Sequence, residues 1–435
     1  MQFVSTRQGP SVSLEAAIMS GTAPDGGLYV PEELPRFDPA ALTQIDTISD
    51  LAAQLLAPFF EASTLKDQLA EICDEAFSFP ARLKLLENSE RGSLSVLELF
   101  HGPTAAFKDF GACFLAACMT RIIGTPDRDS VPVTVLVATS GDTGGAVAAA
   151  FHRQPGVRVV VLFPDGRVTA RQQQQLTCWG DNIISLAVRG GFDDCQRLAK
   201  EMFADGELVQ RYRLCSANSI NVGRLLPQSV YYAQASLANY RRNSRPSSFV
   251  IPTGNLGNAF AGIWAKQMGL PIDQIILATN ANRTIPDFLG SGEWQPRASI
   301  PTLASAMDVG DPSNMERLLN LWGDAAEIGR RLRAFSVSDE IIAQQIAAEH
   351  ARSGFAWCPH TATAFNVYRT LADEERSESH FIIIATAHAA KFESIVEPLI
   401  GEAIEPPDEL ARLLKWPARF ETIDAVTDEI TSRLS

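Results

Sequence analysis

The chain has 435 residues, about three times the usual size of one domain, so we expect two or three lobes with sizeable cores. Its 51 acidic and 37 basic residues give a net charge of −14, which disfavours nonspecific binding to nucleic acid or to anionic membranes. Hydrophobic residues make up 46% of the chain, as is ordinary for a water-soluble globular protein. An anionic small-molecule substrate would therefore need a local basic pocket.

The cysteines and the first residues indicate a cytoplasmic protein. The seven cysteines are scattered, odd in number and without CxxC pairs, which is typical of reduced, buried thiols. The chain start lacks a basic segment followed by a long apolar run, so no signal peptide is indicated. No uninterrupted apolar stretch reaches ~18 residues, which argues against a membrane span.

In chain order, residues 13–21 predict a short helix with a serine start and a glycine stop, and helical patterns continue to about Phe79. This part is predicted to form an N-terminal lobe. Apolar runs then alternate with helices, the pattern of βαβ units around a parallel sheet, so the predicted fold is α/β. The predicted linkers are residues 125–132, 241–248 and 289–301.

Three segments of this α/β region are the most informative. Residues 133–139 predict a strand that passes through SGDTGG into a helix and returns as a strand over residues 157–163. Residues 248–254 predict a second strand, followed by a glycine turn, a helix and another strand. Residues 381–386 predict a third, followed by a helix to about residue 400. A parallel sheet gathers the turns after such strands at one edge.

Lys108 lies in an unusual helical context. Pro103 or Thr104 fits a helix start, and the residues three, four and seven positions from Lys108 are small or uncharged, except for one leucine. Asp109 would point about 100° away round the helix, so no carboxylate pairs with the lysine at helical spacing. A buried lysine avoids the cost of its charge by losing a proton or by condensing with an aldehyde. A solvated, inert lysine is the alternative.

The turn GNLGN over residues 254–258 lies at a strand-to-helix junction, where free backbone N–H groups and the helix dipole favour a phosphate. No Lys-Ser/Thr follows it, so it is not a nucleotide P-loop. A tight turn without a ligand is the alternative.

The segment SGDTGG over residues 140–145 lies at another such junction, with hydroxyls and amides that could grip a carboxylate. Its spacing differs from G-x-G-x-x-G, although Asp165 follows at the end of the next strand. A nucleotide-binding oxidoreductase or a non-catalytic binding protein therefore stays an alternative, as does a plain capping serine.

Two more positions are candidate ligand contacts. Thr386 ends a buried strand, where its hydroxyl could meet a heterocycle nitrogen, although an N-cap is the commoner role. Arg224 follows a polar cluster near a helix start, where the helix dipole opposes a cation and invites an anionic partner; a surface arginine is the alternative. The six histidines show no metal-ligand spacing, and no residue is assigned to a metal.

Six motifs together resemble the threonine synthase family, in the same order and with similar spacings: HGPTAAFKDFG, ATSGDTGGA, SANSIN followed by RLLPQ, IPTGNLGN, SAMDVGDPSN and ATAHAAKF. The likeness runs from GLYVPEELP to about residue 400. It implies a pyridoxal-phosphate enzyme of the tryptophan-synthase-β type. Such an enzyme converts O-phospho-L-homoserine and water to L-threonine and phosphate by γ-elimination and β-addition of water, the last step of threonine biosynthesis.

The resemblance also implies the site residues. Lys108 matches the Schiff-base lysine, which also acts as the general base, and Thr386 matches the hydroxyl beside the pyridine nitrogen. The implied cofactor-binding residues are Lys108, Asp142, Gly254, Asn255, Leu256, Gly257, Asn258 and Thr386. The implied substrate-binding residues are Thr104, Ser140, Gly141, Thr143, Ser219, Asn221 and Arg224, the last three for the substrate phosphate.

Asp142 departs from the wider superfamily, which carries asparagine in this loop. A carboxylate there would repel an ionised ring oxygen of the cofactor, which leaves its direct contact open. Asn258 stands where relatives carry an acidic residue and Ala389 where proline is common.

The resemblance implies two open parallel-sheet α/β domains with the cofactor between them, plus a small, mainly helical N-terminal lobe. The predicted division is residues 1–80 for the lobe, 81–124 with 245–400 for the large cofactor-binding domain, 125–244 for a smaller mobile domain, and 401–435 for a C-terminal extension. A monomer or a homodimer is expected.

A sister enzyme, such as a serine/threonine dehydratase or a cysteine synthase, is the alternative function. Such an enzyme would lack the long N-terminal lobe and the HGPT segment.

Overall fold

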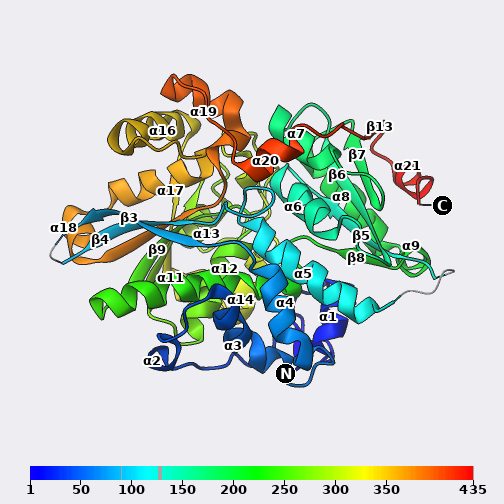
Figure 1. Ribbon diagram of the computed structural model, residues 1–435, viewed down its shortest axis with the longest axis horizontal. Helices are drawn as coiled ribbons and strands as arrows, with labels where there is room; N and C mark the ends of the chain where they lie inside the picture. The colour runs from blue at the N-terminus through cyan, green and yellow to red at the C-terminus, as the bar shows by residue number, and fades with distance from the viewer. Residues whose placement is uncertain (90, 126–129, 435) are drawn as a thin grey trace.

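The computed structural model describes residues 1–89, 91–125 and 130–434. Within them, the strands form a two-stranded sheet, a six-stranded sheet and a five-stranded sheet. Figure 1 shows the six-stranded sheet with its helices on the left, the five-stranded sheet on the right, and the N-terminal helices along the lower edge. The predicted α/β fold with open parallel sheets is confirmed. Of the predicted linker 125–132, residues 126–129 lie outside the described residues.

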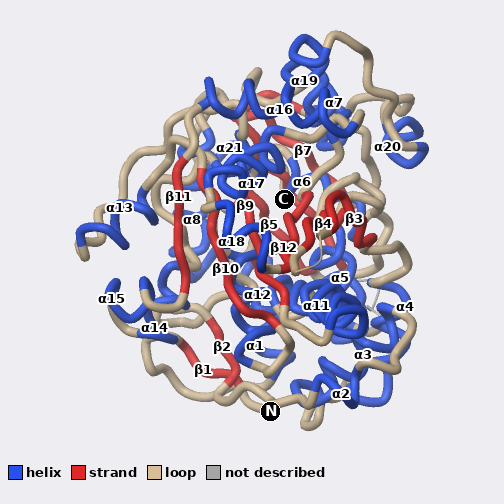
Figure 2. Tube along the Cα trace, turned by 90° about the vertical axis from the view of Figure 1, so that its left-hand side faces the viewer, coloured by secondary structure: helices blue, strands red, loops and turns tan. Residues whose placement is uncertain are grey.

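The N-terminal segment forms helices and one small antiparallel sheet. Its elements are β1 (Phe3–Ser5), α1 (Leu14–Ser20), β2 (Tyr29–Pro31), α2 (Pro39–Leu42), α3 (Ile48–Phe60) and α4 (Leu69–Ala76). Helix α1 begins and ends as its sequence predicts, because the Ser13 hydroxyl accepts from the Ala16 N–H and Gly21 ends the helix with φ +73°. Figure 2 shows β1 and β2 beside α1, away from the two larger sheets.

The six-stranded sheet has the order β11-β10-β9-β12-β4-β3 and is parallel except for its edge strand β3. Its strands are β3 (Arg82–Asn88), β4 (Ser93–Glu98), β9 (Ser247–Pro252), β10 (Ile272–Thr279), β11 (Leu332–Ser336) and β12 (His380–Ala385). Its helical neighbours include α11 (Gln228–Asn243), α12 (Gly257–Gln267), α13 (Thr284–Ser291), α14 (Met315–Trp322), α15 (Ala325–Gly329), α16 (Asp339–Ser353), α17 (Pro359–Thr370), α18 (Asp373–Glu378) and α19 (Glu393–Ile400). The sequence did not predict the antiparallel edge.

The five-stranded sheet has the order β13-β7-β6-β5-β8 and is parallel throughout. Its strands are β5 (Val133–Ala138), β6 (Val157–Pro164), β7 (Ile183–Val188), β8 (Leu214–Ser216) and β13 (Glu421–Ile423). The remaining helices are α5 (Lys108–Ile123), α6 (Asp142–Phe151), α7 (Ala170–Thr177), α8 (Phe192–Ala204), α9 (Gly206–Tyr212), α10 (Val222–Leu225), α20 (Asp408–Leu413) and α21 (Thr427–Thr431). The segment predicted as a C-terminal extension thus adds an edge strand here, while the predicted domain boundaries stay a prediction.

The main core takes residues from both large sheets and from the N-terminal helices. Along β9, Phe249 and Ile251 belong to this core, whereas Val250 belongs to a separate core under α17, because successive side chains of a strand point to opposite faces. Along β6, Val161 joins the main core and Val160 a third core under α8. Strands covered on both faces read as continuous apolar runs, which is how the sequence identified them.

Candidate active site

A cleft opens where the carboxyl ends of strands from both large sheets meet. The cleft is lined by the start of α5, the turns after β5 and β9, the segment before α10, and Thr386 directly after β12. Open α/β sheets place ligands in such crevices.

Lys108 is the first residue of α5, so the predicted helix start at Pro103 or Thr104 is wrong. The Asp109 carboxylate accepts from the backbone N–H and the hydroxyl of Thr104, at 2.9 and 2.5 Å. Ala105 has a φ of +55°, which a right-handed helix does not allow. Local capping by Asp109 thus holds the preceding residues in a bent loop and delays the helix to Lys108.

The Lys108 amine faces the cleft and is partly accessible from it. Burial lowers the pKa of Lys108 to about 8, an effect that the charge of Asp142 opposes and the charge of Arg224 reinforces. The sequence placed no carboxylate near this lysine along its own helix. The fold supplies one from α6, on the other side of the cleft.

The turn after β9 is a close-fitting backbone cradle. Gly254 packs so tightly that an added Cβ would lie 2.7 Å from the Met307 Cα, and one on Gly257 would lie 2.8 Å from the Ser219 Cβ. Leu256 takes a left-handed conformation with φ +62°, directly before α12 begins at Gly257. The free N–H groups at the start of this eleven-residue helix therefore face the cleft, as the phosphate prediction requires.

Neutral side chains hold this turn. Asn255 donates to the Ser219 hydroxyl at 2.9 Å, and Asn314 donates to the Asn255 carbonyl at 2.9 Å. The Asn258 side-chain oxygen accepts from Tyr231 and Tyr232, whereas its buried Nδ2 has no partner. An unpaired buried donor beside a phosphate-type cradle indicates a ligand with an acceptor oxygen.

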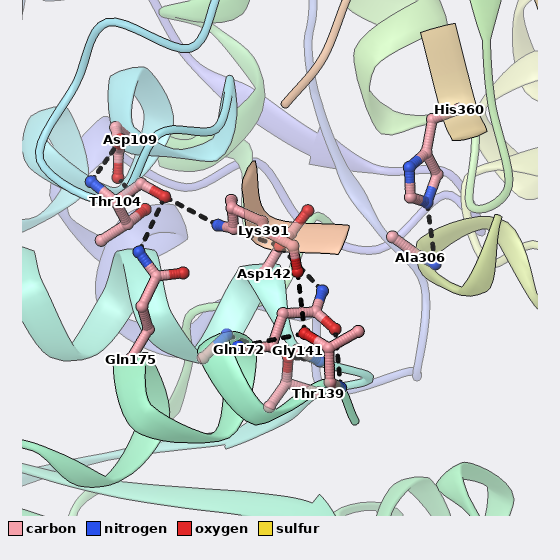
Figure 3. A network of polar contacts seen from close by, with 12 residues as sticks. Thr104, Asp109, Thr139, Gly141, Asp142, Gln172, Gln175, Ala306, His360 and Lys391 are labelled. Atoms are coloured by element: carbon pink, nitrogen blue, oxygen red, sulfur yellow. Dashed lines mark hydrogen bonds and ion pairs between the residues drawn. The ribbon is translucent and has the colours of Figure 1, made fainter. Parts of the chain in front are cut away.

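The turn after β5 differs in charge. The Thr139 hydroxyl accepts from the backbone N–H groups of Gly141 and Gly144, each at 3.0 Å, which shapes the start of α6. Asp142, in the first turn of α6, accepts from Gln172 at 3.1 Å and pairs with Lys391 at 3.0 Å (Figure 3). Burial alone would raise the pKa of Asp142, but the positive charges of Lys391 and Lys108 hold it well below its usual range.

Arg224 is 2% exposed in α10 and lines the cleft. It donates to the carbonyls of Ala217 at 2.5 Å and Lys108 at 3.4 Å, and its Nε has no partner. Burial lowers the pKa of Arg224 to about 10, so the group stays charged at neutral pH. A buried cation that lines a cleft and keeps an unpaired donor suits an anionic ligand.

Most of the predicted site residues line the cleft, and three do not. Those that line it are Lys108, Ser140, Asp142, Thr143, Ser219, Arg224, Gly254, Asn255, Leu256, Gly257, Asn258 and Thr386. Gly141, with φ +137°, shapes the turn against Gln172. The Thr104 carbonyl accepts from Lys391 and Gln175. Asn221 caps α10 and donates to the carbonyls of Ile18 and Ser216.

Sequence reasoning missed two buried groups: His360, which lines the cleft, and Lys391, which pairs with a cleft residue. The His360 Nε2 accepts from the backbone N–H of Ala306 at 3.0 Å, so the neutral ring carries its proton on Nδ1, which is buried without a partner (Figure 3). Burial lowers the pKa of His360 to about 4. Lys391 is fully buried. The motif ATAHAAKF contained Lys391, but nothing local indicated its partner.

Other site types were sought among the described residues. No group of three or more His, Cys, Asp or Glu side chains there could hold a metal ion. None of the helices in that part of the chain combines the length and apolar character needed to cross a membrane. The seven cysteines are unpaired, and all but Cys113 are buried.

The cleft fits pyridoxal phosphate on its own geometry. A lysine amine of lowered pKa, a glycine cradle at a helix start, and unpartnered atoms of Asn258 and His360 suit an aldehyde that carries an anion and a polar ring. Residues 83–387 match the family of pyridoxal-phosphate dependent enzymes, which confirms the predicted cofactor.

The flanking segments and the relatives decide the family. Residues 2–77 match the threonine synthase N terminus, and residues 361–432 match the threonine synthase C-terminal family. The chain is 41% identical over 421 residues to threonine synthase of Escherichia coli (strain K12), covering 95% of this chain and 94% of that protein. The chain belongs to the threonine synthase family. It is also 39% identical to threonine synthase of Serratia marcescens, over 96% of this chain and 95% of that protein.

Two solved structures of threonine synthase share the fold. The crystal structure from Escherichia coli matches with a TM-score of 0.90 and 36% identity, covering 100% of this chain and 99% of that chain. The pyridoxal-phosphate-bound threonine synthase from Brucella melitensis matches with a TM-score of 0.89 and 33% identity, covering 100% and 98%. The resemblance first seen in six short motifs therefore extends to the whole fold.

Proposed function

We propose that this protein converts O-phospho-L-homoserine and water to L-threonine and phosphate with pyridoxal phosphate as cofactor. The observation that carries the proposal is the position of Lys108, at the start of α5 and in one cleft with the glycine cradle after β9. Membership of the threonine synthase family supports the activity.

We propose the following cofactor contacts. The Lys108 amine holds the aldehyde carbon, the turn of residues 254–258 holds the phosphate with its backbone N–H groups, and Thr386 lies beside the pyridine nitrogen. When bound, pyridoxal phosphate supplies an electron sink that stabilises negative charge on the substrate carbons. Asp142 lies at the same cleft and is ionised, so its charge must be offset by a neighbouring cation.

Lys108 is also the proposed general base. Its pKa of about 8 leaves a substantial neutral fraction of the free amine near neutral pH, because burial opposes its protonation. Once the substrate has displaced it, this amine can take a proton from the substrate carbon next to the amino group and return it elsewhere. An ordinary surface lysine would be almost wholly protonated at this pH.

Substrate binding is proposed to use both sides of the cleft. The hydroxyls of Ser140 and Thr143 hold the substrate carboxylate, and Gly141 shapes the turn that carries them. Arg224 and Ser219, which both line the cleft, hold the substrate phosphate. Thr104 and Asn221 support these groups from behind, because Asn221 caps the helix that carries Arg224. Arg224 thus supplies the local positive charge that an anionic substrate needs on a protein with an excess of acidic residues.

We further propose a cytoplasmic enzyme that acts as a monomer or a homodimer, takes a small-molecule substrate, and has no nucleic-acid or membrane partner. The net charge of −14 supports the last point. Sedimentation of the purified protein at micromolar concentration separates monomer from dimer.

The proposed reaction is tested by supplying O-phosphohomoserine to the purified holoenzyme and following phosphate release, with threonine identified by mass spectrometry. We expect equimolar phosphate and threonine. Release of phosphate without threonine would contradict the proposal. Supplying threonine alone tests the dehydratase alternative, because ammonia release at a comparable rate would favour it.

A further inference from the structure

Lys391 links the two large sheets through Asp142, a residue that lines the cleft. It lies in a short 3₁₀ helix, Ala389–Phe392, that follows β12 of the six-stranded sheet. Its fully buried Nζ is 3.0 Å from the Asp142 Oδ1 and 2.7 Å from the Thr104 carbonyl oxygen (Figure 3). Asp142 belongs to α6, which packs on the five-stranded sheet. The ion pair therefore spans the two halves of the site.

Several titratable groups on neighbouring helices face the ion pair of Asp142 and Lys391. Asp142 is faced by Lys391, by Lys108 on α5 and by His360 on α17, and it accepts from the neutral Gln172 on α7. Burial leaves His360 uncharged at neutral pH, because it lowers the pKa of His360 to about 4. The Lys391 ammonium also faces the buried Asp109 on α5, and Lys108 is faced by the charged Arg224 as well as by this pair. The Asp142 carboxylate and the Lys391 ammonium therefore act on Lys108 in opposite directions.

Burying an ion pair costs more desolvation energy than it usually returns, so such a pair is weak support for stability. A buried pair beside a titrating amine has a more direct consequence. A lone carboxylate would stabilise a proton on the Lys108 nitrogen, and a lone ammonium would repel one. Together they oppose each other, while burial, the largest cause, and the charge of Arg224 both lower the pKa of Lys108.

We propose that Lys391 is a positioning residue of the cofactor site, whose ammonium group neutralises Asp142 so that a carboxylate can stand in the same cleft as Lys108 without adding net charge. This inference rests on the proposed attachment of the cofactor at Lys108. It answers the objection that a carboxylate in this loop raises, since the loop presents a neutral ion pair.

Lys391 also fixes the loop that leads into Lys108. The Thr104 carbonyl accepts from both Lys391 and Gln175, at 2.7 and 3.0 Å, while the N–H and hydroxyl of Thr104 bind Asp109. The same ammonium that offsets Asp142 therefore holds the backbone just before the catalytic lysine. The contacts with Asp142 and with the Thr104 carbonyl both come from the Lys391 side chain, so replacing it would change the charge at Asp142 and the support of the loop at once.

The test is a pH titration of the visible absorbance of the holoenzyme, whose chromophore is the cofactor attached at Lys108. We expect Lys391→Met to raise the midpoint by about one pH unit or more, and Asp142→Asn to lower it by a similar amount. The double variant Asp142→Asn/Lys391→Met removes both charges, and its midpoint should lie between those of the single variants. Lys84→Met, on β3 beside the Phe355 ring and outside the cleft, is the matched control with an unchanged midpoint.

Lys391→Met leaves a buried carboxylate unpaired, so this variant alone could fail to fold. The comparison of Asp142→Asn with the double variant still decides, because removing the remaining ammonium must then raise the midpoint. Equal midpoints, or single variants that move in the same direction, would overturn the inference. A wild-type holoenzyme without a visible band from a cofactor on Lys108 would instead overturn the proposed function.

Discussion

The turn after β9 and the turn after β5 both lead from a buried parallel strand into a helix that lines the cleft. The β9 turn is held by neutral amides and hydroxyls, and it brings the N–H groups of a helix start and the unpaired Asn258 Nδ2 to this part of the site. The β5 turn carries the ionised Asp142, matched by Lys391. Similar backbone geometry thus serves different ligand groups, because the surrounding side chains decide which charge each turn accepts.

Lys108 lies in the cleft with both turns, so removing its amine should have the largest effect. Lys108→Ala is expected to lower turnover by roughly 10³-fold or more, because both cofactor attachment and proton transfer lose their group. Steady-state phosphate release measures this loss, with circular dichroism to establish that the fold is kept. Lys84→Ala is the control and should retain activity. A Lys108→Ala enzyme with a substantial fraction of the wild-type rate would contradict the assignment.

The close fit of the β9 turn can be broken with a single methyl group. Gly254→Ala would place its Cβ 2.7 Å from backbone atoms of Met307, so the turn must shift and pyridoxal phosphate should bind about tenfold or more weakly. Gly145→Ala, near the β5 turn, meets nothing nearer than 3.5 Å and is the matched control. Cofactor titration followed by absorbance measures both affinities. Equal affinities would show that the β9 turn does not hold the phosphate.

Neither turn is proposed to hold the substrate phosphate, which we assign to Arg224 as a proposal. Arg224→Ala should raise KM for O-phosphohomoserine by about tenfold, because the substrate phosphate loses a charged donor, and should change cofactor affinity much less. Initial rates over a range of substrate concentrations give KM. If substrate saturation stays the same while cofactor binding weakens, Arg224 belongs to the cofactor phosphate instead.

His360, which lines the same cleft, should make the free energy of unfolding depend on pH. Its pKa in the folded protein lies near 4 because of burial, below the ordinary value of 6.5, so the unfolded chain binds the extra proton first as the pH falls. The stability from this group is complete above about pH 6.5 and is lost between pH 6.5 and 4. We expect the folded state to lose roughly 1–2 kcal/mol at pH 5 relative to pH 7.5 through this group.

Urea unfolding at the two pH values measures the His360 effect. His360→Asn removes the titrating ring and should reduce the loss of unfolding free energy between pH 7.5 and pH 5 by that amount. A variant with the same pH dependence as the wild type would show that His360 is not the neutral, buried group described above.

The sequence predicted those parts of the candidate site that short local patterns, such as apolar runs and glycine turns, indicate. The glycine turn of residues 254–258 and the strands that precede each turn were identified correctly, because a continuous apolar run followed by glycines has few other structures open to it. Lys108 was identified as unusual by its small neighbours. The error at Pro103 and Thr104 arose because Asp109 caps the loop, a competition between side chain and helix that propensity does not capture.

The contacts between residues far apart along the chain could not be predicted from the sequence. Asp142 and Lys391 are far apart along the chain and meet only because one follows a strand of each sheet. His360 was considered only as a metal ligand, and its tautomer depends on a single N–H of Ala306. The carboxylate in the β5 turn therefore looked unfavourable until the fold supplied its cation.

The most direct test is to reduce the holoenzyme with borohydride and map the modified peptide by mass spectrometry. Reduction fixes an imine as a stable amine, so the attached cofactor marks the lysine that carried it. The account predicts added mass on Lys108 alone. Added mass on Lys391, the other buried lysine near the cleft, or on no lysine at all, would contradict it.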